Sequence, residues 1–205
     1  DVYKRQVCVL ATGDPMFFGI GVTLAKHFGA DEMDVVPSLS AFSLAASRLG
    51  WALADVEQLT LHGRPASLIV SFILPGARLM ILSDGADTPA QVAEILVERG
   101  YGDSRIYVLE HMGGPQERGL EGTAADWQHK NIAPFNTVGV DCVAGPDAVV
   151  LPRIPGLPDD AFTSDGNMTK REVRAATLAA LAPIPGQHLW DCLLYTSDAA
   201  DDTPC

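Results

Sequence analysis

Alternating strand and helix signals between residues 7 and 143 constrain the fold of this chain more than any other feature. Six short apolar runs have the length and composition of strands: residues 7–11, 33–36, 58–61, 78–83, 105–110 and 137–143. Four segments carry the apolar spacing or the end signals of helices: residues 17–28, 38–49, 88–99 and 124–129. This alternation predicts an α/β fold with a sheet between helices.

Capping residues predict where two of these helices begin. Ser38 or Ser40 is expected to cap the helix over residues 38–49, and Gly50 to end it. Thr88 and Gln91 have the spacing of a capping box, with a proline between them at a position that needs no backbone donor. The helix over residues 88–99 is therefore expected to start at Thr88.

A change in composition marks the end of the first domain, which we place at residues 7–143. Residues 144–161 are rich in Pro and Gly and predict a linker. Beyond it, Thr169 and Glu172 have the spacing of a second capping box and predict a helix, and residues 186–191 predict a strand. We interpret residues 162–191 as the start of a second, incomplete domain. The two ends, residues 1–6 and 192–205, match neither neighbouring element, and we expect both to be non-native tails.

Charge and composition exclude several classes of partner. The chain has 26 acidic and 14 basic residues and a net charge of -12, without a Lys/Arg run, so nucleic acid is not expected. No apolar stretch approaches the ~20 residues of a membrane span, and no signal peptide opens the chain, so we expect a cytoplasmic protein without a membrane partner. The four cysteines lack metal-ligand spacing, which predicts no metal site.

The loop after the first predicted strand is the sharpest local motif. It reads Thr12-Gly13-Asp14-Pro15 and is followed by Phe17 and by two spaced glycines. One interpretation is structural: Asp14 caps the next helix, and the glycines permit close packing. The spacing matches neither the GxGxxG dinucleotide loop nor the GxxxxGK[ST] phosphate loop, so a nicotinamide- or flavin-dependent oxidoreductase rests only on a strand-Gly-helix unit.

The same loop resembles the S-adenosylmethionine (SAM) binding loop of the tetrapyrrole methylase family. The resemblance continues through residues 36–42, where Ser38 replaces the family's usual glycine, and through Asp84 after the 78–83 strand. It extends to residues 110–113, 121–123 and 135–138. The resemblance implies a tetrapyrrole methylase fold, in which two α/β subdomains hold the cofactor in a cleft, here without the N-terminal strand and loop that open the family's first subdomain.

The resemblance also implies a set of SAM-binding residues: Thr12, Gly13, Asp14, Phe17, Ser40, Ala41, Asp84 and Met112. Several of them have a structural alternative, since Ser40 suits a helix cap and Asp84 a turn. Phe17 and Met112 equally suit an apolar core. For a polycarboxylate substrate, which the acidic chain would otherwise repel, His62 and Arg64 are the candidate contacts, although both also suit an exposed loop.

Residues 162–191 resemble the opening of the second domain found in the two-domain corrin methyltransferases of this family. This likeness implies methylation of carbon 5 of a precorrin by residues 7–143, and links the second domain to carbon-15 methylation and decarboxylation. The alternatives are another tetrapyrrole methylase, of uroporphyrinogen or precorrin-4 type, and an inactive fragment with an open cofactor site. A homo-oligomer that completes the site is also left open by the sequence.

Overall fold

The computed structural model describes residues 7–164 and 167–190, and the chain divides into two compact units between Val150 and Leu151. The tails that the sequence predicts at residues 1–6 and 192–205 lie outside the described residues.

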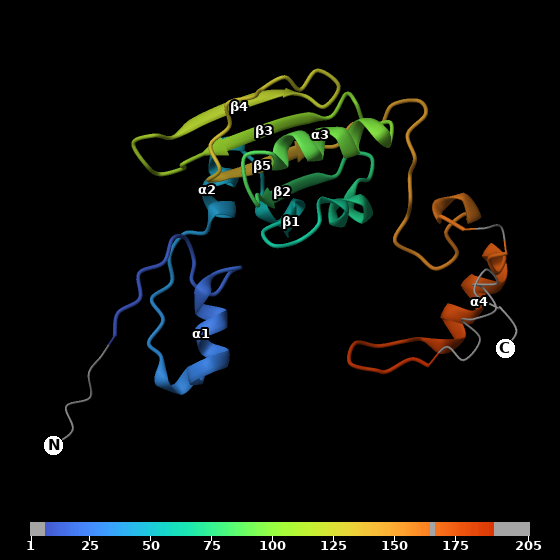
Figure 1. The fold of residues 1–205 in the computed structure, drawn as a ribbon, viewed down its shortest axis with the longest axis horizontal. Coiled ribbons are helices and arrows are strands. Elements are labelled where there is room, and N and C mark those ends of the chain that lie inside the picture. The colour runs from blue at the N-terminus through green and yellow to red at the C-terminus, as the bar shows by residue number, and fades with distance from the viewer. Residues whose placement is uncertain (1–6, 165–166, 191–205) are drawn as a thin grey trace, which may run out of the picture. The chain divides into compact units, whose positions relative to one another are not determined.

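A five-stranded mixed sheet forms the centre of the first unit (Figure 1). Its strands are β1 (Glu57–Thr60), β2 (Arg78–Leu82), β3 (Arg105–Glu110), β4 (Arg118–Thr123) and β5 (Asn136–Asp141). They lie in the order β1-β2-β5-β3-β4; β1 and β2 are parallel, whereas β5 is antiparallel to both β2 and β3. Strands β1, β2 and β3 therefore run in the same direction, and their carboxyl ends meet at one edge of the sheet.

The strand sequences give the sheet two apolar faces, because successive side chains point to opposite sides. On one face, Leu79 and Ile81 of β2 join a buried cluster with Val92 and Leu96 of helix α3 (Thr88–Glu98). The 3-10 helix at Ala66–Phe72 contributes further side chains to this cluster. On the other face, Met80 packs with three residues of helix α2 (Ala41–Leu49), namely Phe42, Ala45 and Ala46. The sheet is therefore covered by helices on both faces, as the sequence predicts.

Helix α2 begins and ends where its sequence predicts. The Ser40 hydroxyl accepts the backbone N–H of Ser43 at 3.1 Å, and Gly50 ends the helix with a φ of 67°. Gly139 of β5 lets the helix lie close to the sheet, since a Cβ atom there would lie 2.7 Å from Leu49 Cδ1. The cap fixes the first turn of α2, and the glycine contact brings its last turn against the middle of the sheet.

The predicted capping box of α3 is wrong. Asp87 occupies the N-cap position and Thr88 is already inside the helix. The Thr88 hydroxyl turns back instead and accepts the backbone N–H groups of Asp84 at 3.1 Å and Gly85 at 3.2 Å. Its hydrogen bonds stabilise the loop between β2 and α3 rather than the helix end.

Several other predicted elements differ in the structure. Residues 7–11 and 33–36 form no strand; the apolar side chains of the first run and Val36 of the second are exposed, while Met33 and Val35 are half-buried. The first helix is α1 (Ile20–Phe28), three residues shorter than predicted, and residues 124–129 form a turn instead of a helix. Strand β4 was not predicted, because its sequence contains two glycines and only one large apolar residue, as suits an exposed edge strand.

The second unit consists of helix α4 (Arg171–Leu181) and the chain that folds onto it. The Arg174 guanidinium donates to Asp159 Oδ1 at 2.5 Å and to the carbonyl of Leu157, and it lies over the Phe162 ring. The predicted capping box at Thr169 is wrong: Lys170 occupies the N-cap position, without a side-chain cap among the described contacts. Residues 186–190 form no strand, and the last residue of that predicted strand lies outside the described part of the chain.

The segment over residues 144–161, which the composition predicts as a linker, is divided between the two units. Gly145 and Val149 donate their backbone N–H groups to the carbonyls of Gly100 and Arg99 at the end of α3. In the second unit, the carbonyl of Gly156 accepts the side chain of Arg171 in α4. Much of this segment is therefore hydrogen-bonded to one unit or the other.

Candidate functional site

The carboxyl edge of the sheet gathers four of the residues that the sequence singles out. His62 and Arg64 follow β1, Asp84 follows β2, and Met112 follows β3. In open α/β sheets, ligands bind in the crevice outside the carboxyl ends of the strands. This edge is therefore the candidate functional site of the first unit.

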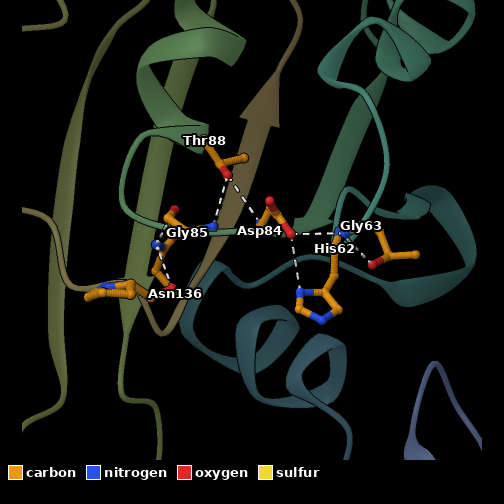
Figure 2. A network of polar contacts seen from close by, with 8 residues as sticks. His62, Gly63, Asp84, Gly85, Thr88 and Asn136 are labelled. Carbon is orange, nitrogen blue, oxygen red and sulfur yellow. Dashed lines mark hydrogen bonds and ion pairs between the residues drawn. The ribbon is translucent and has the colours of Figure 1, made fainter.

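Asp84 connects the loops that follow β1 and β2 (Figure 2). Its Oδ1 atom accepts the backbone N–H of Gly63 at 2.9 Å and lies 3.3 Å from His62 Nδ1. The Asp84 side chain is 59% exposed and that of His62 is 81% exposed, so the pair remains open to a ligand. The contact with Gly63 also gives Asp84 the turn-stabilising role that its sequence position suggests.

Asn136, the first residue of β5, uses both ends of its side-chain amide at the same edge (Figure 2). Its Oδ1 atom accepts the Ser83 hydroxyl at 2.6 Å, and its Nδ2 atom donates to the carbonyls of Ala133 at 2.8 Å and Gly85 at 3.3 Å. Sequence reasoning included Asn136 only within a family motif. The available signal was an amide side chain at the first position of a strand with alternating valines, where burial demands hydrogen-bond partners.

A buried carboxylate holds the segment that leads into β5. Glu110, at the end of β3, is 2% exposed and accepts Arg118 Nε at 2.6 Å and the backbone N–H of Ala133 at 2.7 Å. Arg118 also donates to the carbonyl of Asn131 at 2.6 Å. The hydrogen bond from Arg118, followed by that from Ala133, lowers the pKa of Glu110 despite the opposing effect of burial. Glu110 therefore remains ionised and anchors residues 131–133.

The first turn of α2 lies against the loop at residues 12–18. Gly13 has a φ of 68°, and a Cβ atom built on it would lie 3.9 Å from the Ala41 backbone nitrogen. The Phe17 ring lies 5.2 Å from the Phe42 ring, between ring centroids. Thr12 directly precedes Gly13, and all of these residues come from the two segments that the family resemblance assigns to SAM.

The Asp14 carboxylate has a local role. Its Oδ1 atom accepts the Met16 backbone N–H at 2.8 Å, while α1 starts only at Ile20 and has Gly19 at its N-cap position. The interpretation of Asp14 as a helix cap is therefore wrong. A Cβ atom on Gly19 would lie 2.5 Å from the Asp14 carbonyl oxygen, so only glycine permits this tight loop.

Met112 joins the loop after β3 to the same helix. It packs against the cluster of Phe42 and Met80, and the neighbouring Gly113 donates its N–H to Glu117 Oε2 at 2.7 Å. Glu117 also accepts Arg48 Nε of α2 at 2.5 Å. The hydrogen bond from Arg48, followed by that from Gly113, lowers the pKa of Glu117 to about 2.

The structure thus brings the predicted site residues into two groups. Five of them surround the first turn of α2: Gly13, Phe17, Ser40, Ala41 and Met112. Asp84 and His62 form the second group at the ends of β1 and β2, and Arg64 is part of the turn after β1. Ser40 also serves as the helix cap, so its alternative structural role is real.

Metal ligation and membrane spanning find no support within residues 7–164 and 167–190. No group of three or more His, Cys, Asp or Glu side chains there is arranged to hold a metal ion. None of the helices in the same residues has both the length and the apolar character to span a membrane.

Comparison with known proteins finds relatives with similarity across both units. The chain is 46% identical over 185 residues to a precorrin-6Y C(5,15)-methyltransferase [decarboxylating] of Sinorhizobium sp, covering 90% of this chain and 45% of that protein. It is 32% identical over 116 residues to a cobalt-precorrin-7 C(5)-methyltransferase of Salmonella typhimurium, covering 56% of each. The chain therefore spans about half the length of these relatives, or slightly more.

The fold has a counterpart among solved structures. The crystal structure of the methyltransferase CobJ superposes with a TM-score of 0.53 at 18% identity, covering 63% of this chain and 62% of that one, which indicates a shared fold and nothing finer. Residues 160–193 match the model of the precorrin methyltransferase domain. Residues 2–128 match the model of the tetrapyrrole (corrin/porphyrin) methylases, more than half of the chain. The family and fold that the sequence predicts are confirmed: this chain belongs to the tetrapyrrole methylases.

Proposed function

We propose that the first unit binds SAM and transfers its methyl group to carbon 5 of a precorrin, as a step of cobalamin biosynthesis. The observation that carries the proposal is the 46% identity to a precorrin-6Y C(5,15)-methyltransferase, which extends across both units in the same order. The similarity to a cobalt-precorrin-7 C(5)-methyltransferase is confined to about half of this chain, in agreement with a carbon-5 activity of one domain. The match of residues 160–193 supports a relation of the second unit to the carbon-15 reaction.

The residues around the first turn of α2 suit the chemical parts of SAM. The cofactor supplies a methyl group on a positively charged sulfur. Asp14, oriented by its hydrogen bond from Met16, offers a carboxylate to the ammonium group. Phe17 and Met112 offer apolar surface to the adenosine, and Ser40 and Ala41 line the adjacent turn. We assign Thr12, Gly13 and Asp84 to the same site.

Methyl transfer of this kind depends on position more than on a chemical group of the protein. The reacting carbon must lie in line with the methyl group, and excluding water strengthens the electrostatic contacts. We assign substrate carboxylates to His62 and Arg64, because a guanidinium pairs with a carboxylate through two hydrogen bonds. The Arg64 guanidinium would locally offset the net charge of -12, and the His62 ring would donate a hydrogen bond.

Calorimetric titration with S-adenosylhomocysteine tests the cofactor site. Asp14→Asn should weaken binding by about tenfold, because it removes a charge-assisted contact. The matched control is Asp31→Asn, an exposed carboxylate outside the proposed site, which should leave the affinity unchanged. Equal affinities of the two variants would contradict the assignment of Asp14.

Incubation with SAM carrying a labelled methyl group tests the reaction. Label should appear on a precorrin with a free carbon 5 and not on uroporphyrinogen or a precorrin-4. Label on either of the latter would replace the proposal by the corresponding methylase.

A second candidate is a folded chain whose cofactor site is open and inactive. The specific observation in its favour is the exposure of apolar side chains before α2, with Leu10 at 92% and Val36 at 77%. Absence of heat at saturating S-adenosylhomocysteine, with the far-UV circular dichroism of a folded protein, would favour this second candidate.

A further inference from the structure

Three loops at the carboxyl edge are joined by side chains rather than by the sheet itself. The loop after β1 meets the loop after β2 through Asp84 and Gly63, and the loop after β2 meets the segment before β5 through Asn136 (Figure 2). Asn136 and Ser83 are 53 positions apart in the sequence. The antiparallel pairing of β2 with β5, with Leu82 opposite Thr137, brings them together.

The Asn136 side chain contacts the residues on both sides of Asp84. Its oxygen accepts from the Ser83 hydroxyl, and its amide nitrogen donates to the Gly85 carbonyl and to the Ala133 carbonyl. A carboxylate at this position would keep the acceptor but would face two carbonyl oxygens without a proton to donate. An aliphatic side chain would supply neither. Because Asn136 is only 9% exposed, water has little access to replace these hydrogen bonds.

The backbone at Asp84 is consequently held from two directions. Thr88 accepts the N–H groups of Asp84 and Gly85 from the α3 side, while Asn136 binds Ser83 and Gly85 from the β5 side. With the backbone fixed, the carboxylate is directed at the Gly63 N–H and lies next to His62. The direction of the Asp84 side chain therefore depends on the Asn136 amide.

We propose that Asn136 is a positioning residue, which holds Ser83 and Gly85 so that the Asp84 carboxylate is presented to the cofactor. The positioning itself rests on the geometry above; only the identity of what Asp84 contacts rests on the proposed function. Asn136 acts through Asp84 and does not itself touch the cofactor in this proposal.

The test compares Asn136→Asp with Asn131→Asp, the same chemical change at an exposed asparagine five residues earlier. The first readout is the amide proton resonance of Gly63, with Asp84→Asn as the reference for a lost carboxylate contact. The resonance should move toward its Asp84→Asn position in Asn136→Asp and stay unchanged in Asn131→Asp. The second readout is the affinity for S-adenosylhomocysteine, which should fall about tenfold in Asn136→Asp alone.

Each outcome decides one part of the proposal. A Gly63 resonance that stays in place in folded Asn136→Asp would overturn the positioning role, even if the melting temperature falls. If the resonance moves but the affinity does not change, Asn136 positions Asp84 and the cofactor contact of Asp84 is overturned. A wild-type chain that binds no S-adenosylhomocysteine refutes the proposed function, and the Gly63 resonance still decides the positioning role. Should Asn136→Asp fail to fold, Ser83→Ala removes only the 2.6 Å hydrogen bond and is expected to move the same resonance less.

Discussion

Replacing Glu110 by alanine tests how the sheet holds the segment that leads into β5. The Glu110 carboxylate is 2% exposed and accepts three hydrogen bonds, from Arg118 Nε, from Arg118 Nη2 and from the Ala133 backbone N–H. Alanine removes all three hydrogen bonds at once. The backbone N–H of Ala133, a half-buried residue, then loses its acceptor.

The expected loss of stability depends on which hydrogen-bond partner of Glu110, Arg118 or Ala133, can bind water instead. The Arg118 side chain is 50% exposed and regains solvation, so we assign the loss of stability to Ala133. A buried backbone N–H left without an acceptor costs about 1–3 kcal/mol, and the half-buried Ala133 belongs at the lower end of that range. Glu110→Ala should therefore lower the free energy of unfolding by about 1 kcal/mol. Glu110→Gln keeps an oxygen opposite Ala133 and should lose less than half of that.

Urea unfolding at pH 7, followed by tryptophan fluorescence, measures both variants. With a slope of roughly 2 kcal/mol per molar urea, the midpoint of Glu110→Ala should fall by about 0.5 M. Equal losses in the alanine and glutamine variants would refute the reasoning, because the backbone N–H would then contribute nothing. A slope that differs from wild type would instead indicate a change in the surface exposed on unfolding.

The pH dependence of stability gives the same prediction a second readout. Arg118 and Ala133 lower the pKa of Glu110 from its ordinary value of 4.5, so the folded chain binds this proton less readily than the unfolded chain. The stabilisation from Glu110 is therefore complete above pH about 4.5 and is lost as the pH falls toward the folded pKa. Below pH 4.5, the free energy of unfolding should decline more steeply in wild type than in Glu110→Gln. Parallel curves would contradict the lowered pKa.

Three further predictions concern the core and the end of α3. Tyr101 is fully buried, and its hydroxyl has no hydrogen-bond partner among the described residues. Tyr101→Phe should therefore raise the free energy of unfolding by about 1 kcal/mol, as measured by thermal denaturation. A loss of stability would instead reveal a partner of the hydroxyl. A Cβ atom on Gly100, at a φ of 79°, would lie 2.8 Å from the Ala148 backbone, whereas a Cβ atom on Gly50 would have no atom within 4 Å. Gly100→Ala should therefore lower the melting temperature more than Gly50→Ala. Equal effects would contradict the close packing at Gly100. Burial raises the pKa of Cys142 to about 12. Iodoacetamide at pH 8 should therefore modify this cysteine in urea but not in the folded chain, which peptide mass spectrometry would detect. Equal modification in both conditions would contradict the burial of Cys142.

Local sequence signals predicted elements well where tertiary packing agreed with them. The Ser40 cap and the Gly50 stop of α2 are correct because both depend on backbone groups within one turn. Strand β2 is correct because its apolar run is buried on both faces, and β3 is correct because its buried residues alternate with less buried ones, as in a strand with one core face. Residues 7–11 have an equally apolar run, but no neighbouring strand pairs with it among the described residues, and it forms no strand. Hydrophobicity alone does not specify pairing.

The sequence predicted the individual loops of the candidate site, because each motif lies within one loop, but it did not predict the contacts between strands and loops. The motif at Gly13 and the motif at Ala41 were each visible, and the structure brings them into contact. The role of Asn136 was not, because it depends on which strand lies beside β2, and the chain order does not reveal that β5 is inserted there. The Thr88 hydroxyl was misassigned for a related reason, since a cap and a loop contact use the same donor and acceptor chemistry.

The insertion of β5 between β2 and β3 has a consequence for how the first unit acquires its structure during synthesis. Strands β2 and β3 leave the ribosome before β5 and do not pair with each other, so each presents an unpaired edge until residues 136–141 follow. The carboxyl edge with its loops is therefore assembled last, by a pairing of high sequence separation, which slows folding and prolongs exposure of strand edges.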